Sequence, residues 1–367
     1  MEPAFLTAIH IEKVRHLKDI DIPLSPSERK NLIFTGKNGS GKTSILDNLA
    51  SYLQATVSGP KHETISEVVV GCRSFSQLRK RYNDGLLVLA YYRDNRSIET
   101  EFASGLERVS LKRIYNIWDA PVKDFVKYLV NLKAIQAFSL NEGSSNRAEE
   151  VREWFQSLET ILRTIYEDDS LKLNFNTETF QFAITVNGRE PFDFNTMSRG
   201  YAAVFDIIAD LMMRMESQRR YDLDGIVLID EIETHLHVEL QKKIVPILTE
   251  LFPNIQFIMT THSPFVLNSA QNTVIYDLEK HMLVEEGLTN LPYEGIVEGY
   301  FGADRMSQEL RGKFERYKAL VGKAELTDEE FAETAELETY LDEVPDYLAL
   351  EFSAEYSRLK LEFANRG

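Results

Sequence analysis

The sequence predicts an α/β protein built on a parallel β-sheet, with an inserted lobe and a helical extension. Three apolar runs indicate this fold class. The first, Asn31 to Thr35 (NLIFT), leads into the glycine-rich segment GKNGSGKT, and residues 44–54 have helical periodicity. The other two, GIVLIDE at 225–231 and NIQFIMTTHSP at 254–264, end in acidic or polar residues. Continuous apolar runs of this kind are typical of strands in a parallel sheet that is covered on both faces.

The segment Gly36 to Thr43 matches the phosphate-binding pattern G-x-x-x-x-G-K-[ST], in the strand–loop–helix context that the pattern needs. Its glycines let backbone N–H groups turn toward a polyanion, and the following helix adds its positive N-terminal end. The lysine of the pattern reaches the β- and γ-phosphates, and the final hydroxyl binds Mg²⁺. The sequence therefore predicts ATP and Mg²⁺ as cofactors. The predicted nucleotide-binding residues here are Gly36, Lys37, Asn38, Gly39, Ser40, Gly41, Lys42 and Thr43, with Thr43 also a metal ligand.

Two acids close the run GIVLIDE. Asp230, at the predicted strand end, is placed to hold Mg²⁺ opposite Thr43. Glu231 follows and is predicted to polarise the attacking water. His262 comes just after the next apolar run, where open α/β sheets bind their ligands. We expect it to contact a γ-phosphate oxygen or the water.

A further anion site is predicted at Ser198-Arg199-Gly200, which opens a helical pattern before the strand of Asp230. A serine and a glycine at a helix N-terminus offer free N–H groups and a positive dipole. Because the chain already has one phosphate loop, this second site suggests the nucleotide of a partner subunit. An ordinary helix cap would have the same sequence pattern.

These four motifs resemble the ABC-type ATPase heads of the RecF, OLD and SMC families. The resemblance implies a P-loop NTPase fold with a mixed sheet and helical insertions. It identifies GKNGSGKT as Walker A, Ser198-Arg199-Gly200 as the signature loop, Asp230 and Glu231 as Walker B, and His262 as the switch histidine. The signature departs from the usual LSGGQ, since Arg199 replaces the first glycine and Tyr201 the glutamine.

The resemblance also implies some weaker assignments. Arg15 stands where such heads carry an arginine near the nucleotide, and Gln136 is predicted to be the glutamine that helps to hold Mg²⁺, with Gln54 as the other candidate. The segment 231–237 (EIETHLH) is expected to form a subunit contact. Its two histidines are two positions apart and do not share a helix face, so a metal pair is disfavoured.

The predicted organisation has three parts. Residues 1–50 and 190–286 form the ATPase core, residues 51–189 an inserted lobe with helices and a hairpin, and residues 287–367 an acidic helical extension. Within the lobe, 147–167 is predicted to be an amphipathic helix and 171–186 a hairpin. Sustained heptads are missing, so a long coiled-coil arm is not expected.

Composition limits the class of protein. The net charge of the 367 residues is −17, and 321–367 contain 13 acidic and 4 basic side chains, a net charge of −9. This balance disfavours general binding to duplex DNA, which depends on neutralising phosphates. One cysteine allows no internal disulfide. No apolar run reaches membrane-spanning length and no secretory pattern is present, so we expect a cytoplasmic protein.

The whole pattern is similar to PtuA-type ATPases of the Septu and retron anti-phage systems. It combines a compact head, MSRGY, IVLIDEIETHLH, TTHSPFVLNS and an acidic helical tail. The resemblance implies an ATPase that forms a homodimer or larger homo-oligomer and controls a separate HNH-type nuclease, with a retron reverse transcriptase and its nucleic acid as a further possible partner. A RecF-like repair ATPase that binds DNA directly is the alternative. A kinase or a transporter-type ATPase is a third class, but no acceptor pocket or membrane partner is indicated.

Overall fold

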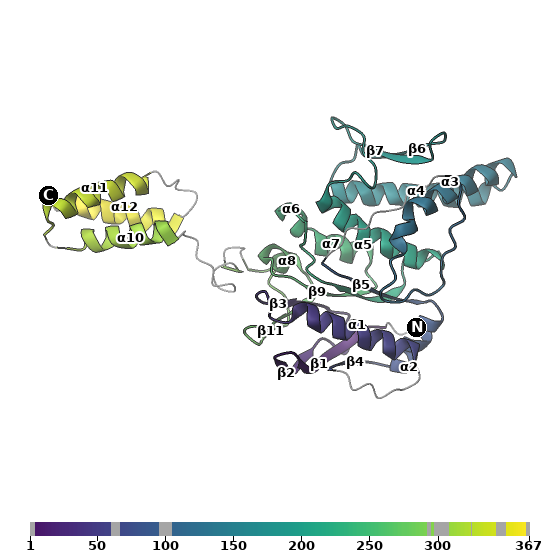
Figure 1. Ribbon diagram of the computed structural model, residues 1–367, viewed down its shortest axis with the longest axis horizontal. Coiled ribbons are helices and arrows are strands. Elements are labelled where there is room, and N and C mark those ends of the chain that lie inside the picture. The colour runs from purple at the N-terminus through teal and green to yellow at the C-terminus, as the bar shows by residue number, and fades with distance from the viewer. Residues whose placement is uncertain are drawn as a thin grey trace. The chain divides into compact units, whose positions relative to one another are not determined.

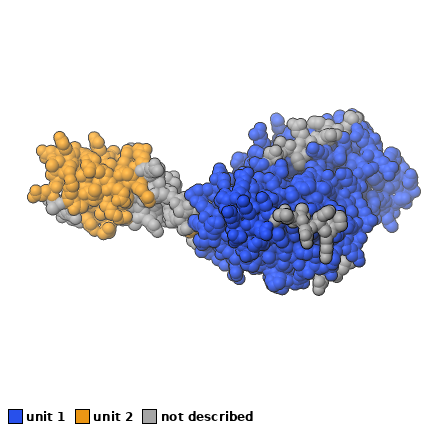
Figure 2. Space-filling view, turned by 60° about the horizontal axis from the view of Figure 1, so that its bottom comes forward, with its two compact units in different colours: residues 1–291 blue, residues 292–367 orange. Residues whose placement is uncertain are grey.

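The computed structural model describes residues 4–59, 67–94, 105–291, 295–296, 308–323, 325–342 and 350–364. The chain divides into two compact units, residues 1–291 and 292–367, which Figure 2 colours separately. The predicted start of the acidic extension, residue 287, lies near this division.

A six-stranded sheet organises the first unit, in the order β11-β10-β3-β9-β8-β5 (Figure 1). The five strands from β10 to β5 pair in parallel, and β11 pairs antiparallel with β10, so the sheet is mixed as predicted. Strands β3, β5 and β9 are buried along their whole length, which explains their unbroken apolar sequences. The strands are β3 (Asn31–Thr35), β5 (Leu87–Tyr92), β8 (Asp224–Ile229), β9 (Ile255–Thr260), β10 (Thr273–Asp277) and β11 (Met282–Val284).

One face of this sheet is covered by α1 (Lys42–Ser58) and by a second sheet of three antiparallel strands (Figure 1). A single apolar cluster joins α1 to residues of both sheets, including Ile9, Phe34, Leu49 and Leu228. The helix α1 is therefore clamped from both sides, and its N-terminus is fixed beside the end of β3. The three-stranded sheet consists of β1 (Leu6–Val14), β2 (Leu17–Pro23) and β4 (Val68–Cys72), and α2 (Phe75–Asn83) follows it.

The opposite face carries α5 (Arg199–Glu216) and the helices of the lobe (Figure 1). An aromatic cluster binds these elements together, with Phe125 edge-on to both Phe194 and Phe205 at centroid distances of 5.8 and 5.5 Å. The predicted helix and hairpin of the lobe are confirmed as α4 and as β6 with β7. The elements of the lobe are η1 (Pro121–Asp124), α3 (Phe125–Asn141), α4 (Ser145–Tyr166), β6 (Lys172–Asn176) and β7 (Gln181–Thr185).

The lobe begins later in the chain than the predicted boundary at residue 51. The helix α1 continues to Ser58, β4 completes the three-stranded sheet, and β5 pairs with β8 at the edge of the main sheet. These segments pack into the nucleotide-binding core because their partners are core strands far away in the sequence. Short helices α6 (Val238–Gln241), α7 (Ile244–Leu251) and α8 (Pro264–Ser269) complete the unit.

Among its described residues, the second unit contains the helices α10 (Gln308–Val321), α11 (Asp328–Asp342) and α12 (Leu350–Ala364). They enclose a small apolar core around Phe314, Tyr317 and Tyr356. Ion pairs join helix to helix, such as Arg316 with Glu333 at 2.7 Å and Lys318 with Glu355 at 2.5 Å. The acidic segment is thus folded into helices, as the sequence predicts.

Gly225, at the start of β8, is closely packed between the neighbouring strands of the main sheet. A methyl group there would lie 2.3 Å from Ile255 Cδ1 and 2.9 Å from the carbonyl oxygen of Val88. We expect Gly225→Ala to lower the free energy of unfolding by about 1–3 kcal/mol, because the neighbouring strands must move apart. Urea titration followed by circular dichroism measures this change. Gly105→Ala is the control, since a methyl group at Gly105 would meet nothing within 4 Å; equal stability of the two variants would contradict the packing argument.

Candidate nucleotide-binding and hydrolytic site

Four neighbouring parallel strands end at the same edge of the sheet, and each supplies predicted or newly found site residues. In spatial order, β3 leads into Gly36, β9 ends before Thr261 and His262, β8 ends before Asp230, and β5 ends before Arg93. The carboxyl edge of parallel strands is where open α/β sheets bind ligands. The topology therefore brings Walker A, Walker B and the switch histidine to one edge.

The phosphate loop needs its three glycines for backbone conformation. Gly36, Gly39 and Gly41 have φ of 137°, 86° and 100°, a region that other residues rarely adopt. Lys42 is buried, and its Nζ donates to the carbonyl oxygens of Gly36 at 2.8 Å and Lys37 at 3.1 Å. The ammonium group thus lies over the loop itself, while Thr43 at the start of α1 is exposed.

The turn between β1 and β2 lies against this loop. A methyl group on Gly41 would meet Leu17 Cδ1 at 2.9 Å and His16 Cε1 at 3.9 Å. Arg15, in the same turn, is exposed and has a left-handed backbone with φ of 55°. Arg15 thus lies in a turn whose other residues pack on the phosphate loop, and its contact with a nucleotide stays a prediction.

Asp230 is buried at the end of β8, and its Oδ1 accepts a hydrogen bond of 2.5 Å from Thr260 Oγ1. Thr260 also accepts from the backbone N–H of Glu231 at 2.7 Å. Glu231 is half-buried and has φ of 44°, a strained conformation for a residue with a side chain, at a cost of roughly 1–3 kcal/mol. One threonine therefore fixes both Walker B acids.

His262 is held by a buried acid that the sequence analysis left without a role. Glu233 Oε1 lies 2.8 Å from His262 Nδ1 and accepts the backbone N–H of His262 at 2.7 Å. Its Oε2 accepts from Thr261 Oγ1 at 2.7 Å. In the sequence, Glu233 is visible only as an acid two positions after Glu231. Its partners, Thr261 and His262, follow a different strand, so the sequence alone does not reveal the contact.

The charges around His262 show which groups lie near it. The hydrogen bond to Glu233 raises the pKa of His262 above its ordinary value; partial burial opposes this rise, Glu231 adds to it and Lys42 works against it. Burial alone would raise the pKa of Glu233, but hydrogen bonds from His262 and Thr261 lower it overall. Glu231 and Lys42 both act on this ring, so the edge between β3 and β8 forms one electrostatic unit.

The signature segment forms the N-terminus of α5, with Ser198 at the N-cap position. Ser198 and Arg199 are exposed at its N-terminus, whereas Gly200 is buried against the loop after β8. A methyl group on Gly200 would lie 3.1 Å from the carbonyl oxygen of His235 and 3.9 Å from His237 Cδ2. In the described part of the chain, no hydrogen bond joins Ser198 or Arg199 to the phosphate loop. The predicted contact segment 231–237 thus packs on the signature segment.

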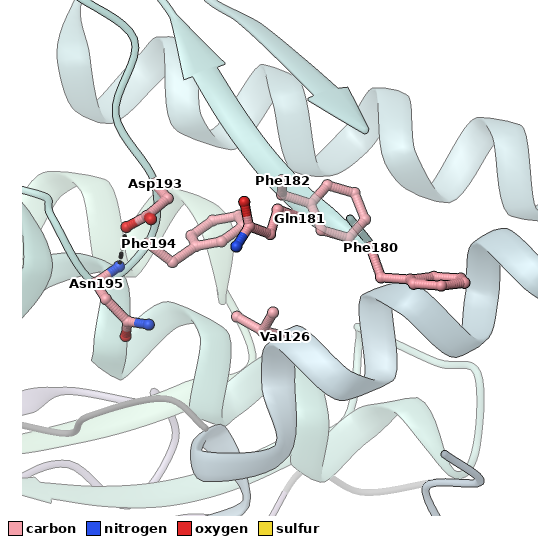
Figure 3. Close-up of a pocket in the computed structure, with 7 residues that line it drawn as sticks. All are labelled: Val126, Phe180, Gln181, Phe182, Asp193, Phe194 and Asn195. Atoms are coloured by element: carbon pink, nitrogen blue, oxygen red, sulfur yellow. Dashed lines mark hydrogen bonds between the residues drawn. The ribbon is translucent and has the colours of Figure 1, made fainter. Parts of the chain in front are cut away.

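The hairpin of the lobe shapes the approach to Ser198. Figure 3 shows Phe182 of β7 and Phe194 around a cavity of about 20 Å³ above Val126 of α3. Asp193 Oδ1 accepts the backbone N–H groups of Asn195 and Thr196 at 2.9 and 2.8 Å. This turn and the aromatic packing fix the backbone that enters α5. The cavity is large enough for about one water molecule and is no ligand pocket.

The structure corrects the assignment of the magnesium-binding glutamine. Gln136 lies on α3, on the sheet face opposite α1 (Figure 1), and its Oε1 accepts from Lys133 Nζ at 3.3 Å. The alternative, Gln54, is buried and has structural partners on both amide atoms: Ile117 N donates to its Oε1 at 2.8 Å, and its Nε2 donates to Ser58 Oγ at 2.5 Å. Neither glutamine lies at the strand edge.

The segment that does reach this edge beside Asp230 follows β5. The backbone N–H of Asp230 donates to the carbonyl oxygen of Tyr92 at 2.8 Å. The next residue, Arg93, pairs with Asp47 at 2.8 Å, one helical turn after Thr43. Burial and the charges of Asp230 and Asp47 raise the pKa of Tyr91. Sequence reasoning missed Arg93 and Asp47 because no motif marks either of them.

The donor set fits a magnesium–triphosphate. Among the described residues, the buried atoms Asp230 Oδ2, Thr35 Oγ1 and Ser40 Oγ have no hydrogen-bond partner. Buried polar atoms are almost always paired, so these three indicate a polar ligand at the strand edge. In the same part of the chain, no group of three or more His, Cys, Asp or Glu side chains could hold a metal alone. Such a site suits Mg²⁺, which is commonly bound by one or two protein ligands together with phosphates.

Comparison with known proteins agrees with this geometry. A family model described as "AAA domain, putative AbiEii toxin, Type IV TA system" matches residues 78–268. The chain belongs to this family. The match includes the signature segment, both Walker B acids and His262, whereas the phosphate loop precedes it. It confirms the prediction of an ATPase domain.

Named relatives of this AAA-domain chain include a Septu protein PtuA of Bacillus mycoides, 26% identical over 86% of the chain and 47% of the relative. A Septu protein PtuA of Bacillus thuringiensis is 22% identical over 77% of the chain and 81% of the relative. The Retron Vc95 probable ATPase of Vibrio cholerae is 36% identical over 33% of the chain and 25% of the relative. These relatives confirm the resemblance inferred from the motifs, although the chain spans about half the length of the first relative.

Among solved structures, an SMC head bound to a domain of ScpA covers 75% of this chain and 94% of that head, with a TM-score of 0.43 and 14% identity. An SMC head of Thermotoga maritima gives a TM-score of 0.39 at 12% identity, over 74% of this chain and 94% of that head. In the described residues, no helix combines the length and apolar character that crossing a membrane requires.

We expect Thr260→Val to lower the free energy of unfolding by about 1–3 kcal/mol. The variant removes the hydroxyl that donates to Asp230 and accepts from Glu231, and both groups lose their partner in a buried place. Thr260→Ser keeps the hydroxyl and should remain close to wild type. Urea unfolding of the two variants measures the difference. Equal stability would show that the hydroxyl does not fix the Walker B acids.

Proposed function

We propose that this chain binds ATP with Mg²⁺ at the carboxyl edge of β3, β9, β8 and β5, and that its nucleotide state controls a partner nuclease. The observation that supports hydrolysis is the convergence of Lys42, Glu231 and His262 at one edge, where Lys42 and Glu231 both act on the pKa of His262. The unpaired Oδ2 of Asp230 beside this group supports a metal ligand there.

The residues divide the work of hydrolysis. Backbone N–H groups of 36–43 and the N-terminus of α1 bind the phosphates, and Lys42 turns from the loop carbonyls to the β/γ-phosphates. Mg²⁺ would be held by Thr43 and Asp230, and when bound it neutralises the developing phosphate charge. Glu231 orients and deprotonates the attacking water, while His262 contacts the transferred phosphoryl group.

Association of two heads is the second part of the proposal. The exposed Ser198 and Arg199 offer an anion site at the N-terminus of the 18-residue helix α5, and within the described chain they make no hydrogen bond to its own phosphate loop. A nucleotide held by a second copy fits this site. ATP would then stabilise one arrangement of the two heads and ADP would not, because only ATP has the γ-phosphate that the second head can contact.

The partner is proposed to be an HNH-type nuclease, as the resemblance to PtuA-type ATPases implies; the Septu PtuA and retron ATPase relatives support that resemblance. The net charge of −17 supports a protein partner over direct contact with DNA. Co-purification of the natively expressed chain tests this proposal. We expect a nuclease to co-elute with the chain and to cleave nucleic acid in a manner that depends on ATP. Strong DNA binding by the purified chain at physiological salt would instead support the RecF-like alternative.

Lys42→Ala should lose most nucleotide binding, because no other side chain at the loop supplies a buried positive charge toward the β/γ-phosphates. A fall in ATP affinity of at least about tenfold is expected, as for a charged hydrogen bond of 1.5–3 kcal/mol. Isothermal titration calorimetry measures it. Lys112→Ala is the matched control, because Lys112 is an exposed lysine outside the loop that pairs with Asp119. Equal losses in the two variants would contradict the role of Lys42.

Glu231→Gln should bind ATP with near wild-type affinity but hydrolyse it about 100-fold more slowly or worse, since a general base is removed. The blocked variant should accumulate as ATP-dependent dimers in size-exclusion chromatography with light scattering. Glu239→Gln, an exposed acid paired with Lys242, is the control. Wild-type turnover by Glu231→Gln would exclude this carboxylate as the base.

A further inference from the structure

A second carboxylate lies behind the site described above. Glu233 is three residues past Asp230, and its side chain is 6% exposed. Both carboxylate oxygens accept hydrogen bonds from the segment after β9: Oε1 from the backbone N–H of His262 and Oε2 from Thr261 Oγ1, each at 2.7 Å. Glu233 therefore joins the end of β8 to the end of β9, and among the described residues no hydrogen bond joins it to the phosphate loop.

The histidine that it holds has one ring nitrogen committed and one available. His262 Nδ1 lies 2.8 Å from Glu233 Oε1, whereas Nε2 makes no hydrogen bond to any described residue. The imidazole side chain is 54% exposed. A buried acceptor behind Nδ1 fixes both the tautomer and the plane of the ring, and it leaves Nε2 to a ligand.

Three charged groups act on this ring, from two elements of the fold. Glu233 and Glu231 lie in the loop after β8, and Lys42 lies at the start of α1. Two carboxylates against one ammonium favour the positively charged ring. The closer carboxylate is the buried one, and a buried charge is weakly screened by solvent. Glu233 is therefore the dominant support of the imidazolium.

We propose that Glu233 is a positioning residue for hydrolysis: it orients His262 through Nδ1 and keeps the ring protonated, so that Nε2–H donates to the phosphoryl group being transferred. This inference rests on the proposed ATPase mechanism and adds to it the state and orientation of the histidine. The proton on Nε2 is donated as a hydrogen bond to a phosphate oxygen and stays on the ring.

The variant Glu233→Gln tests the proposal. It preserves size and can still accept the backbone N–H of His262, but it removes the charge. We expect kcat to fall by at least about tenfold, as when partners that orient a functional histidine are removed, while KM for ATP changes little. Because the protonated ring is the active form, activity is lost as pH rises through the pKa of His262. In Glu233→Gln this falling limb should move to lower pH.

A direct readout accompanies the kinetics. In protein labelled at histidine, the NMR titration of His262, assigned by its absence in His262→Ala, should show a lower pKa in Glu233→Gln than in wild type. Glu239→Gln removes an exposed carboxylate and should change neither measurement. Should Glu233→Gln fail to fold, Glu233→Asp retracts the carboxylate by one methylene and should shift both readouts in the same direction by a smaller amount.

The possible outcomes distinguish a failure of the positioning role of Glu233 from a failure of the proposed ATPase function. Wild-type turnover combined with an unchanged pKa of His262 and an unchanged pH profile in the folded Glu233 variant overturns the positioning role alone. Absence of ATP hydrolysis by the wild-type chain removes the proposed function, while the NMR titration still reports whether Glu233 holds the proton on His262.

Discussion

The position of β9 between β3 and β8 is the constraint on which the site depends. The end of β9 is hydrogen-bonded on both sides: Thr261 N–H donates to Phe34 O at 3.0 Å, and Ile232 N–H donates to Thr260 O at 3.1 Å. Thr260 Oγ1 adds the links to Asp230 and Glu231. Since parallel strands in register end at the same level, a motif at 36–43 and another near 230 become neighbours. The order of the strands in the sheet therefore brings the residues of the proposed site together.

The hydrogen bonds of Thr260 also hold the strained loop that follows β8. Glu231 and His235 both have left-handed backbones, with φ of 44° and 68°. Each would be unfavourable alone, and the surrounding structure must fix them. The first turns the chain sharply after β8, and the segment then passes Glu233 to His262 and His235 to Gly200. A single loop thus contacts both the switch histidine and the signature segment.

Local motifs account for what the sequence predicts well. The phosphate loop, the two Walker B acids and His262 each adjoin a short apolar run, and the run itself indicates a strand end. The contacts that sequence reasoning missed are long-range. Glu233 bonds residues on another strand, β5 pairs with β8, and Arg93 reaches Asp47 across the site. Gln136 is a candidate because it follows an aromatic-rich helical segment, but the fold carries α3 to the other face of the sheet. Gln54, the other candidate, follows Walker A closely in the sequence and supports the backbone of Ile117.

The signature segment shows how a departure from a family pattern can acquire a structural role. Tyr201, which the resemblance aligns with the usual glutamine, stacks its ring on Tyr166 at the end of α4, with centroids 4.0 Å apart and planes 16° apart. Tyr166 packs in turn on Phe192, in the chain that leads from the hairpin to Ser198. Aromatic pairs contribute about 0.5–1.5 kcal/mol beyond their buried area, so this contact couples the lobe to the first turn of α5. The inserted lobe is thus packed directly on the first turn of the helix that begins with the signature segment.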